Sequence, residues 1–138
     1  MKPEFGITSD AWTSGNPGIG GARVTDLKGN QLDFHNTPAT ELHSNNFFEL
    51  LGISLAVRYA LKNGIKVVYT DSQTAMAWVR NRMPGKNVKM DRDMLIARAN
   101  LIADRCEKYG IEIKKWNTSE WGEIPSDYGR KSGGKKVA

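Results

Sequence analysis

Hydrophobic and polar positions divide the chain into an opening set of short strands and a longer part in which helices and strands alternate. Three strands are predicted in the opening part: Phe5 to Trp12, Gly20 to Asp26 and Gln31 to Phe34. The first closes with Ser9-Asp10 before a strong turn signal, Ser14-Gly15-Asn16-Pro17-Gly18. Lys28-Gly29-Asn30 is a natural tight turn between the other two strands. We therefore expect the chain to begin with an antiparallel meander.

The rest of the chain alternates helices with strands. Helices are predicted over Asn46 to Lys62, Ser72 to about Arg82 and Asp91 to Tyr109, and strands over Ile65 to Thr70 and Ile111 to Trp116. The first of these helices is apolar nearly all round, so it must be heavily buried, and Asn63-Gly64 ends it. We expect Trp121 to Arg130 to form a loop with at most one helical turn. This order predicts an α/β fold.

Size and composition fit one soluble globular domain. A chain of 138 residues, 39% of them hydrophobic, is one domain by the usual size rule. No stretch approaches the roughly 20 apolar residues of a membrane span, and the first residues lack the apolar segment of a signal peptide. Cys106 is the single cysteine, which excludes a disulfide framework and a cysteine-based zinc site. We therefore expect a reducing, cytoplasmic setting.

The charge balance suits a polyanionic partner, because the chain carries a net charge of +5 and has a pI near 9.4. Basic residues gather at two places: Arg80, Arg82, Lys86, Lys89 and Arg92, and then Arg130, Lys131, Lys135 and Lys136. Such runs are usually solvated faces. Here they flank segments with acids at strand and helix ends, which also fits an anion-binding rim around an acidic centre. We expect residues 1–131 to form the folded domain and residues 132–138 to be a flexible basic tail.

Four acidic residues occupy unusual places in the predicted elements. Asp10 ends the first strand, Glu49 lies in the first turn of the most hydrophobic helix, Asp71 follows a buried strand, and Asp127 follows Pro125-Ser126. Each has a structural explanation, because short acids cap helices and a glutamate in a first turn complements the helix dipole. For each acid taken alone, this explanation is the better one. For all four together, in a chain with a basic rim, a shared role becomes the competing hypothesis.

Binding of divalent cations is a role that four carboxylates can share. Two hard cations about 4 Å apart need several oxygen ligands, and such a pair can activate water and stabilise the leaving oxygen of a phosphodiester. The chain contains neither a Gly-x-Ser-x-Gly elbow nor a Gly-x4-Gly-Lys-Ser/Thr phosphate loop. His35 and His43 lack a local nucleophile motif, and we interpret His43 as a loop histidine. The sequence therefore favours metal-dependent chemistry.

Four motifs in register resemble the catalytic domain of type 1 ribonuclease H. They are Ser9-Asp10-x4-Gly15-Asn16-Pro17-Gly18, Ser44-Asn45-Asn46-x2-Glu49, Tyr69-Thr70-Asp71-Ser72-Gln73 and the stretch Trp116 to Lys131. The resemblance covers about Phe5 to Lys131, and its last part is similar to a Bacillus-type bacterial subgroup. It implies an RNase H-like fold, in which helices flank a five-stranded mixed sheet of three antiparallel and then two parallel strands.

The resemblance also implies an activity, which is hydrolysis of the RNA strand of an RNA/DNA hybrid to give 5′-phosphate and 3′-hydroxyl ends. Asp10, Glu49, Asp71 and Asp127 would hold two Mg²⁺ ions, with Asp10 bridging them and Mn²⁺ as a substitute. Glu123 matches a subgroup acid that assists metal exchange or product release, and its structural alternative is a solvated loop acid. We expect a monomer with no obligate protein partner, although the sequence itself does not fix the oligomeric state.

The same motifs imply the residues that contact the hybrid. An enzyme that distinguishes RNA from DNA reads the 2′-hydroxyl in the minor groove with short donors and acceptors. Three residues match or neighbour the positions that read the RNA strand: Gly15, Asn45 and Gln73. Five match or neighbour positions that hold phosphates: Asn16, Ser44, Asn46, Lys86 and Asn87. Turn geometry is the structural alternative for the asparagines, and it suits Asn16 better than Asn45 and Asn46.

The chain departs from the family pattern in three places. No histidine lies in the loop before Asp127, Met83 to Lys89 is too short for a helical basic protrusion, and Ala11-Trp12 replaces the usual Gly-Ser after the first aspartate. We therefore expect hybrid binding to be modest and strongly salt-dependent. Two alternative functions stay open: a non-catalytic module that binds hybrids or RNA, and another nuclease of the same superfold, such as a resolvase or an exonuclease.

Overall fold

The expected meander is present in the computed structural model, which describes residues 1–128. It consists of β1 (Ile7–Gly15), β2 (Gly18–Thr25) and β3 (Gln31–Asn36), each antiparallel to the next. The turn between β2 and β3 is held by Asp26, whose carboxylate accepts hydrogen bonds from the backbone N–H groups of Lys28 and Asn30, both at 2.9 Å. Gly29 supplies the left-handed conformation that this turn needs, with φ of +91°.

The remaining elements follow the predicted order. They are α1 (Asn45–Asn63), β4 (Val67–Thr70), α2 (Gln73–Asn81), α3 (Arg92–Tyr109), β5 (Glu112–Lys115) and the short α4 (Thr118–Trp121). β4 runs parallel to both β1 and β5, so the sheet has five strands in the order β3-β2-β1-β4-β5. The predicted fold class, a mixed sheet flanked by helices, is confirmed.

Two boundaries differ from the prediction in ways that matter for the acids. β1 does not close at Asp10; it continues to Gly15, because β2 pairs with it from Thr8 as far as Gly15, which lies opposite Gly18. Asp10 therefore lies in the middle of a strand. α1 begins at Asn45, which makes Glu49 its fifth residue and leaves no acid in its first turn. The dipole explanation for Glu49 is therefore wrong, because the effect is confined to the first turn.

Serine side chains cap the two helices that precede and follow β4. The Ser44 hydroxyl accepts a hydrogen bond from the Phe47 N–H at the start of α1, and the Ser72 hydroxyl accepts one from the Ala75 N–H at the start of α2, both at 3.1 Å. Gly64 ends α1 in the left-handed conformation. Because Ser72 caps α2, Asp71 is not the residue whose side chain does so.

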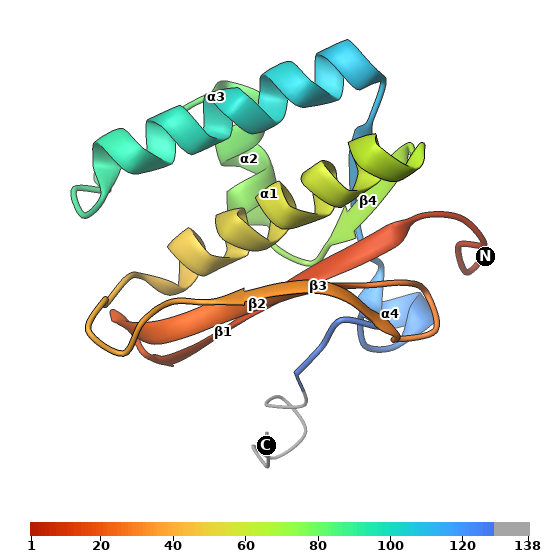
Figure 1. Ribbon diagram of the computed structural model, residues 1–138, viewed down its shortest axis with the longest axis horizontal. Coiled ribbons are helices and arrows are strands. Elements are labelled where there is room, and N and C mark those ends of the chain that lie inside the picture. Colours follow the sequence, from red (N-terminus) through yellow and green to blue (C-terminus); the bar gives the residue numbers. More distant parts are fainter. Residues whose placement is uncertain (129–138) are drawn as a thin grey trace.

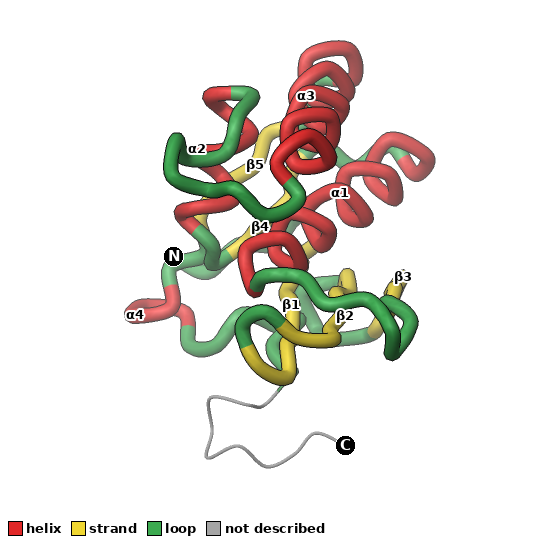
Figure 2. Tube along the Cα trace, turned by 90° about the vertical axis from the view of Figure 1, so that its left-hand side faces the viewer, coloured by secondary structure: helices red, strands yellow, loops and turns green. Residues whose placement is uncertain are grey.

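Three helices cover one face of the sheet, and α1 lies directly on β1 and β2 (Figure 1). Figure 2 shows α3 beside α1, on the side away from the strands. Glycines permit the close approach of α1: a Cβ on Gly20 would lie 2.7 Å from the Phe48 ring, and one on Gly52 would lie 3.4 Å from the Asp10 carbonyl oxygen. Gly52 and Glu49 are three residues apart on the same side of α1. The approach therefore brings Glu49 to β1 near Asp10.

The main core lies between α1, the sheet and the inner faces of α2 and α3. A second cluster of aromatic residues packs where the C-terminal segment meets β4. Its rings meet edge to face, with centroids 5.5 Å apart for Tyr69 and Trp116 and 5.0 Å apart for Trp116 and Trp121. The Trp116 indole N–H donates to the Gly122 carbonyl oxygen at 2.9 Å, and Ile124 is buried with the cluster. This packing fixes the segment that leads to Asp127.

No helix within residues 1–128 is both long and apolar enough to cross a membrane. The tail predicted for 132–138, together with Arg130 and Lys131, lies outside the described residues.

Candidate metal centre and nucleic-acid interface

The parallel pairing of the two central strands sets the position of two acids. β1 and β4 pair over Ile7 with Val68 and Thr8 with Tyr69. Asp10 follows Thr8 by two residues, and Asp71 follows Tyr69 by two residues. Asp10 and Asp71 are therefore each two residues beyond the last β1–β4 pair. At this point β4 ends, whereas β1 continues beside β2.

Glu49 completes a group of three carboxylates. One oxygen each from Asp10, Glu49 and Asp71 can be chosen so that all three lie within 4.8 Å of one another. Asp10 is 3% exposed, whereas Glu49 and Asp71 are half-buried. Carboxylates this close repel one another when they are ionised, and the burial of Asp10 makes its charged form still less favourable. A hard divalent cation relieves both effects, so the donor set fits Mg²⁺ or Mn²⁺.

Asp127 lies outside this three-residue group, and an arginine holds its segment against the sheet. The Arg23 guanidinium donates from Nε to the Ser126 carbonyl oxygen at 2.9 Å and from Nη2 to the Asp127 carbonyl oxygen at 2.7 Å. It also lies over the Tyr128 ring, 4.6 Å from the centroid. Arg23 is the cross-strand partner of Asp10. The backbone that carries Asp127 is therefore tied to the residue opposite Asp10.

Sequence reasoning did not identify Arg23. The available signal was its placement, because Arg23 stands between Ala22 and Val24, which are fully buried in β2. A charged residue in such a strand needs partners for its guanidinium. Those partners are backbone carbonyls more than 100 residues away along the chain, which no local pattern indicates.

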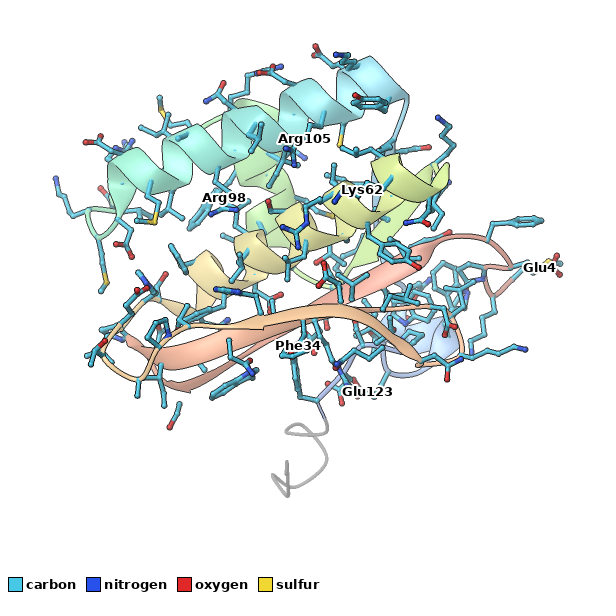
Figure 3. The ribbon with its side chains drawn as sticks, in the orientation of Figure 1. Glu4, Phe34, Lys62, Arg98, Arg105 and Glu123 are labelled. Carbon is cyan, nitrogen blue, oxygen red and sulfur yellow. The ribbon has the colours of Figure 1, made fainter. Side chains whose placement is uncertain are left out.

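Glu123 lies in the same C-terminal segment, after α4. Its side chain is exposed and makes no hydrogen bond or ion pair with the rest of residues 1–128 (Figure 3). The structure therefore shows a solvated acid in the segment that leads to Asp127, and the role implied for Glu123 stays a prediction.

Several residues predicted to contact a hybrid come together where the β1–β2 turn meets the start of α1. The Asn45 N–H donates to the Asn16 side-chain oxygen at 2.9 Å, and the Thr13 hydroxyl donates to the Asn45 side-chain oxygen at 2.8 Å. Asn16 follows Gly15, and Ser44 precedes Asn45. We call Gly15, Asn16, Ser44, Asn45 and Asn46 the reading cluster. The Asn16 side chain is thus oriented by the backbone of Asn45, and the Asn45 side chain is oriented by Thr13.

The other predicted contact residues lie apart from the reading cluster. Gln73 is the exposed first residue of α2. Lys86 and Asn87 are exposed in the loop between α2 and α3. Arg92 orders that loop by donating to the carbonyl oxygens of Gly85 and Val88, at 2.8 Å and 2.7 Å. The structure thus presents three separate sets of polar groups, one each on the reading cluster, α2 and the basic loop.

His43 connects the reading cluster to the start of α3, which the interpretation as a plain loop residue did not foresee. Its ring nitrogens lie 2.7 Å from an Asp91 carboxylate oxygen and 3.2 Å from a Glu41 carboxylate oxygen, and its ring stacks on Phe47 with centroids 3.8 Å apart. Its backbone exchanges two 2.9 Å hydrogen bonds with Gly18. Burial lowers the pKa of His43, but the hydrogen bonds and charges of Asp91 and Glu41 outweigh burial and raise the pKa above its ordinary value.

Taken together, the chain is an α/β protein with an acidic cluster at the carboxyl end of a parallel strand. No protein-family model matches it. Its fold is that of ribonuclease H domains, as three solved structures illustrate. The N-terminal RNase H domain of a Mycobacterium tuberculosis protein is 23% identical, with a TM-score of 0.53 over 80% of this chain and 86% of that one.

The other two solved structures extend the same likeness. LC11-RNase H1, obtained from compost by a metagenomic approach and solved with an RNA/DNA hybrid, is 19% identical, with a TM-score of 0.54 over 83% of this chain and 86% of that one. The RNase H domain of PFV is 17% identical, with a TM-score of 0.56 over 85% of this chain and 81% of that one. At these identities the likeness establishes the fold.

Proposed function

We propose that this protein is a type 1 ribonuclease H, a metal-dependent endoribonuclease that hydrolyses the RNA strand of RNA/DNA hybrids to 5′-phosphate and 3′-hydroxyl ends. The observation that carries the proposal is the group formed by Asp10, Glu49 and Asp71, whose carboxylate oxygens lie within 4.8 Å of one another on this fold. A solved protein of the same fold is bound to an RNA/DNA hybrid, which supports the choice of substrate. The stretch from Trp121 to Lys131 resembles a Bacillus-type bacterial subgroup, and we propose that the protein belongs to that subgroup.

The proposed cofactor is a pair of Mg²⁺ ions held by Asp10, Glu49, Asp71 and Asp127. Two such ions supply Lewis-acid activation of water and stabilisation of the leaving oxygen. Asp10 is the most buried of these carboxylates, which suits a ligand shared between two cations. Arg23 holds the Asp127 segment against β2, opposite Asp10. The exposed Glu123 would assist metal exchange or product release.

The chain's other polar groups would position the hybrid. Asn45 and Gly15 would contact RNA 2′-hydroxyls, with the Asn45 amide oriented by Thr13. Gln73 would contact the same strand from α2. Ser44 and Asn46 would hold a DNA-strand phosphate, with Asn16 beside them, and Lys86 and Asn87 in the basic loop would add phosphate contacts. The protein needs no partner for these contacts, and we propose that it acts as a cytoplasmic monomer.

Cleavage of an end-labelled hybrid with Mg²⁺ tests the proposal. Wild-type protein should cut only the RNA strand, and Asp71→Asn should lower the rate at least a hundredfold, which corresponds to about 2.7 kcal/mol in the barrier. Asp93→Asn is the matched control, because Asp93 is an exposed aspartate in the first turn of α3. This variant should cleave the hybrid at the wild-type rate. An Asp71→Asn rate within a few-fold of wild type would refute the metal-ligand assignment.

The same substrates separate the alternative functions. Hybrid binding without Mg²⁺-dependent turnover would indicate a binding module. Cleavage of branched or duplex DNA in preference to the hybrid would indicate a resolvase or an exonuclease of this superfold.

A further inference from the structure

A pocket of about 320 Å³ lies beside α2, at the same end of the sheet as the acidic cluster. Gln73, Met76, Ala77, Arg80 and Lys115 line it. We call it the α2 pocket. None of its lining residues belongs to the acidic cluster or to the reading cluster.

The position of the α2 pocket follows from helix and sheet geometry. Its four α2 residues stand at intervals of three, one and three, so they share one face of that helix. Lys115 ends β5 and pairs with Thr70, the residue immediately before Asp71. Paired strands lie about 4.8 Å apart. The pocket therefore begins about one strand spacing from Asp71, on the side opposite β1.

The chemistry of the lining suits an anion. Two cationic side chains and one amide face the pocket, and no acidic residue lines it. The Arg80 side chain is exposed and has no hydrogen-bond or ion-pair partner within residues 1–128. The Lys115 amine makes one 3.1 Å hydrogen bond to the Trp116 carbonyl oxygen, which leaves further N–H donors for a ligand. Guanidinium and ammonium groups are the side chains that most often bind phosphates, so a pocket lined by one of each, next to the apolar Met76 and Ala77, can hold one.

We propose that the α2 pocket binds a backbone phosphate of the RNA strand, next to the phosphate that is cleaved. This inference rests on the proposed function and adds a subsite to it. The strand is assigned by Gln73, which lines the pocket and is also the α2 residue proposed to contact RNA. A strand with one phosphate at Asp71 and a 2′-hydroxyl at Gln73 carries its neighbouring phosphate toward Arg80 and Lys115. The residues proposed for a DNA-strand phosphate, Ser44 and Asn46, do not line this pocket.

The first test measures hybrid affinity without cleavage, in EDTA, over a range of salt concentrations. Arg80→Gln/Lys115→Gln should raise the Kd about three- to tenfold at 0.1 M salt and reduce the slope of log K against log salt by about one, as loss of one phosphate contact predicts. Lys62→Gln/Lys108→Gln removes the same charge from the last turns of α1 and α3 and is the matched control (Figure 3 labels Lys62). The control slope should stay at the wild-type value.

The second test assigns the strand by ethylation of single phosphates in an end-labelled hybrid, followed by separation of bound and free molecules. Wild type should lose binding when an RNA phosphate beside the cleavage site is ethylated. The double variant should no longer respond to ethylation of that phosphate, and its response to ethylation of every other phosphate should match wild type. The subsite would be overturned if the double variant had the same slope of log K against log salt as the control variant. It would also be overturned if the double variant kept the wild-type pattern of ethylation interference on the RNA strand, or differed from wild type only on the DNA strand. If wild type cleaves hybrids while the subsite tests fail, the subsite is wrong and the proposed function stands; a wild type that neither binds nor cleaves hybrids refutes both.

Discussion

Replacement of Arg23 tests whether Asp127 depends on the sheet for its position. Arg23→Lys keeps the positive charge but cannot reproduce the fork that binds the carbonyl oxygens of Ser126 and Asp127 at 2.9 Å and 2.7 Å. Arg23→Gln removes the charge as well. Both substitutions leave Asp10, Glu49 and Asp71 in place, but Arg23 stands opposite Asp10 across the β1–β2 pair. An effect on catalysis can therefore pass through the Asp127 segment or through the field at Asp10.

The expected magnitude follows from the two hydrogen bonds. Hydrogen bonds to a charged donor contribute about 1.5–3 kcal/mol each, and the half-buried position of Arg23 favours the lower value. A lysine keeps one of the two contacts, so the position of the Asp127 segment against β2 loses about 1.5 kcal/mol. This corresponds to a change of close to tenfold in the equilibrium between the bound and the released segment. The segment remains anchored by buried Ile124 and by the Trp116 hydrogen bond to Gly122, which limits the loss.

Steady-state cleavage of a hybrid with increasing Mg²⁺ measures this effect. Arg23→Lys should lower kcat about tenfold and raise the Mg²⁺ concentration needed for half-maximal rate, with KM for the hybrid within twofold of wild type. Arg23→Gln should lower kcat further. Arg58→Lys is the control, because Arg58 also binds a distant partner, the Asp33 carboxylate at 2.9 Å, but makes no contact with the Asp127 segment. A kcat for both Arg23 variants within twofold of the Arg58 control would show that Asp127 is not positioned in this way.

Three further predictions concern stability. The pKa of His43 is raised in the folded protein, so its ion pairs stabilise the fold below the ordinary histidine pKa and lose that effect as pH rises through the raised value. Urea denaturation should therefore show that wild type is more stable than His43→Gln at pH 6, and that this difference shrinks by pH 8. Ser72→Ala removes the cap of α2 and should cost about 1 kcal/mol in the same assay. Gly20→Ala places a methyl group against the Trp12 carbonyl oxygen and 2.7 Å from the Phe48 ring and should lower stability by about 1–3 kcal/mol; Phe48→Leu should not restore the loss, because the backbone contact with Trp12 remains.

The sequence predicted elements well where the deciding signals are local. The apolar run around Phe48 required a buried helix, Gly64 supplied its end, and the polar residues after Thr70 marked where β4 stops. The extent of β1 depends instead on its neighbour. Residues after Asp10 remain in the strand because β2 pairs with them as far as Gly15, and this pairing is not written in the segment itself.

The candidate site divides in the same way. Asp10 and Asp71 could be singled out because each is an acid beside a short apolar strand, and Glu49 because it interrupts an apolar helix. Nothing in these local signals shows that the three carboxylates meet, since that depends on the β1–β4 pairing and on the close approach of α1. The roles of Arg23 and His43 were missed for the same reason, because their partners lie far away along the chain.

The pairing of β1 with β4 and of β4 with β5 also explains why the proposed chemistry and the proposed RNA subsite are neighbours. Asp10 on β1, Asp71 after β4 and Lys115 on β5 come from three adjacent strands at one end of the sheet. A shift of β4 by one residue against β1 would turn its alternate side chains to the other face and separate Asp71 from Asp10. The same shift would move Thr70 away from Lys115. One register therefore determines both where the scissile phosphate would bind and where the next phosphate of that strand would find its cations.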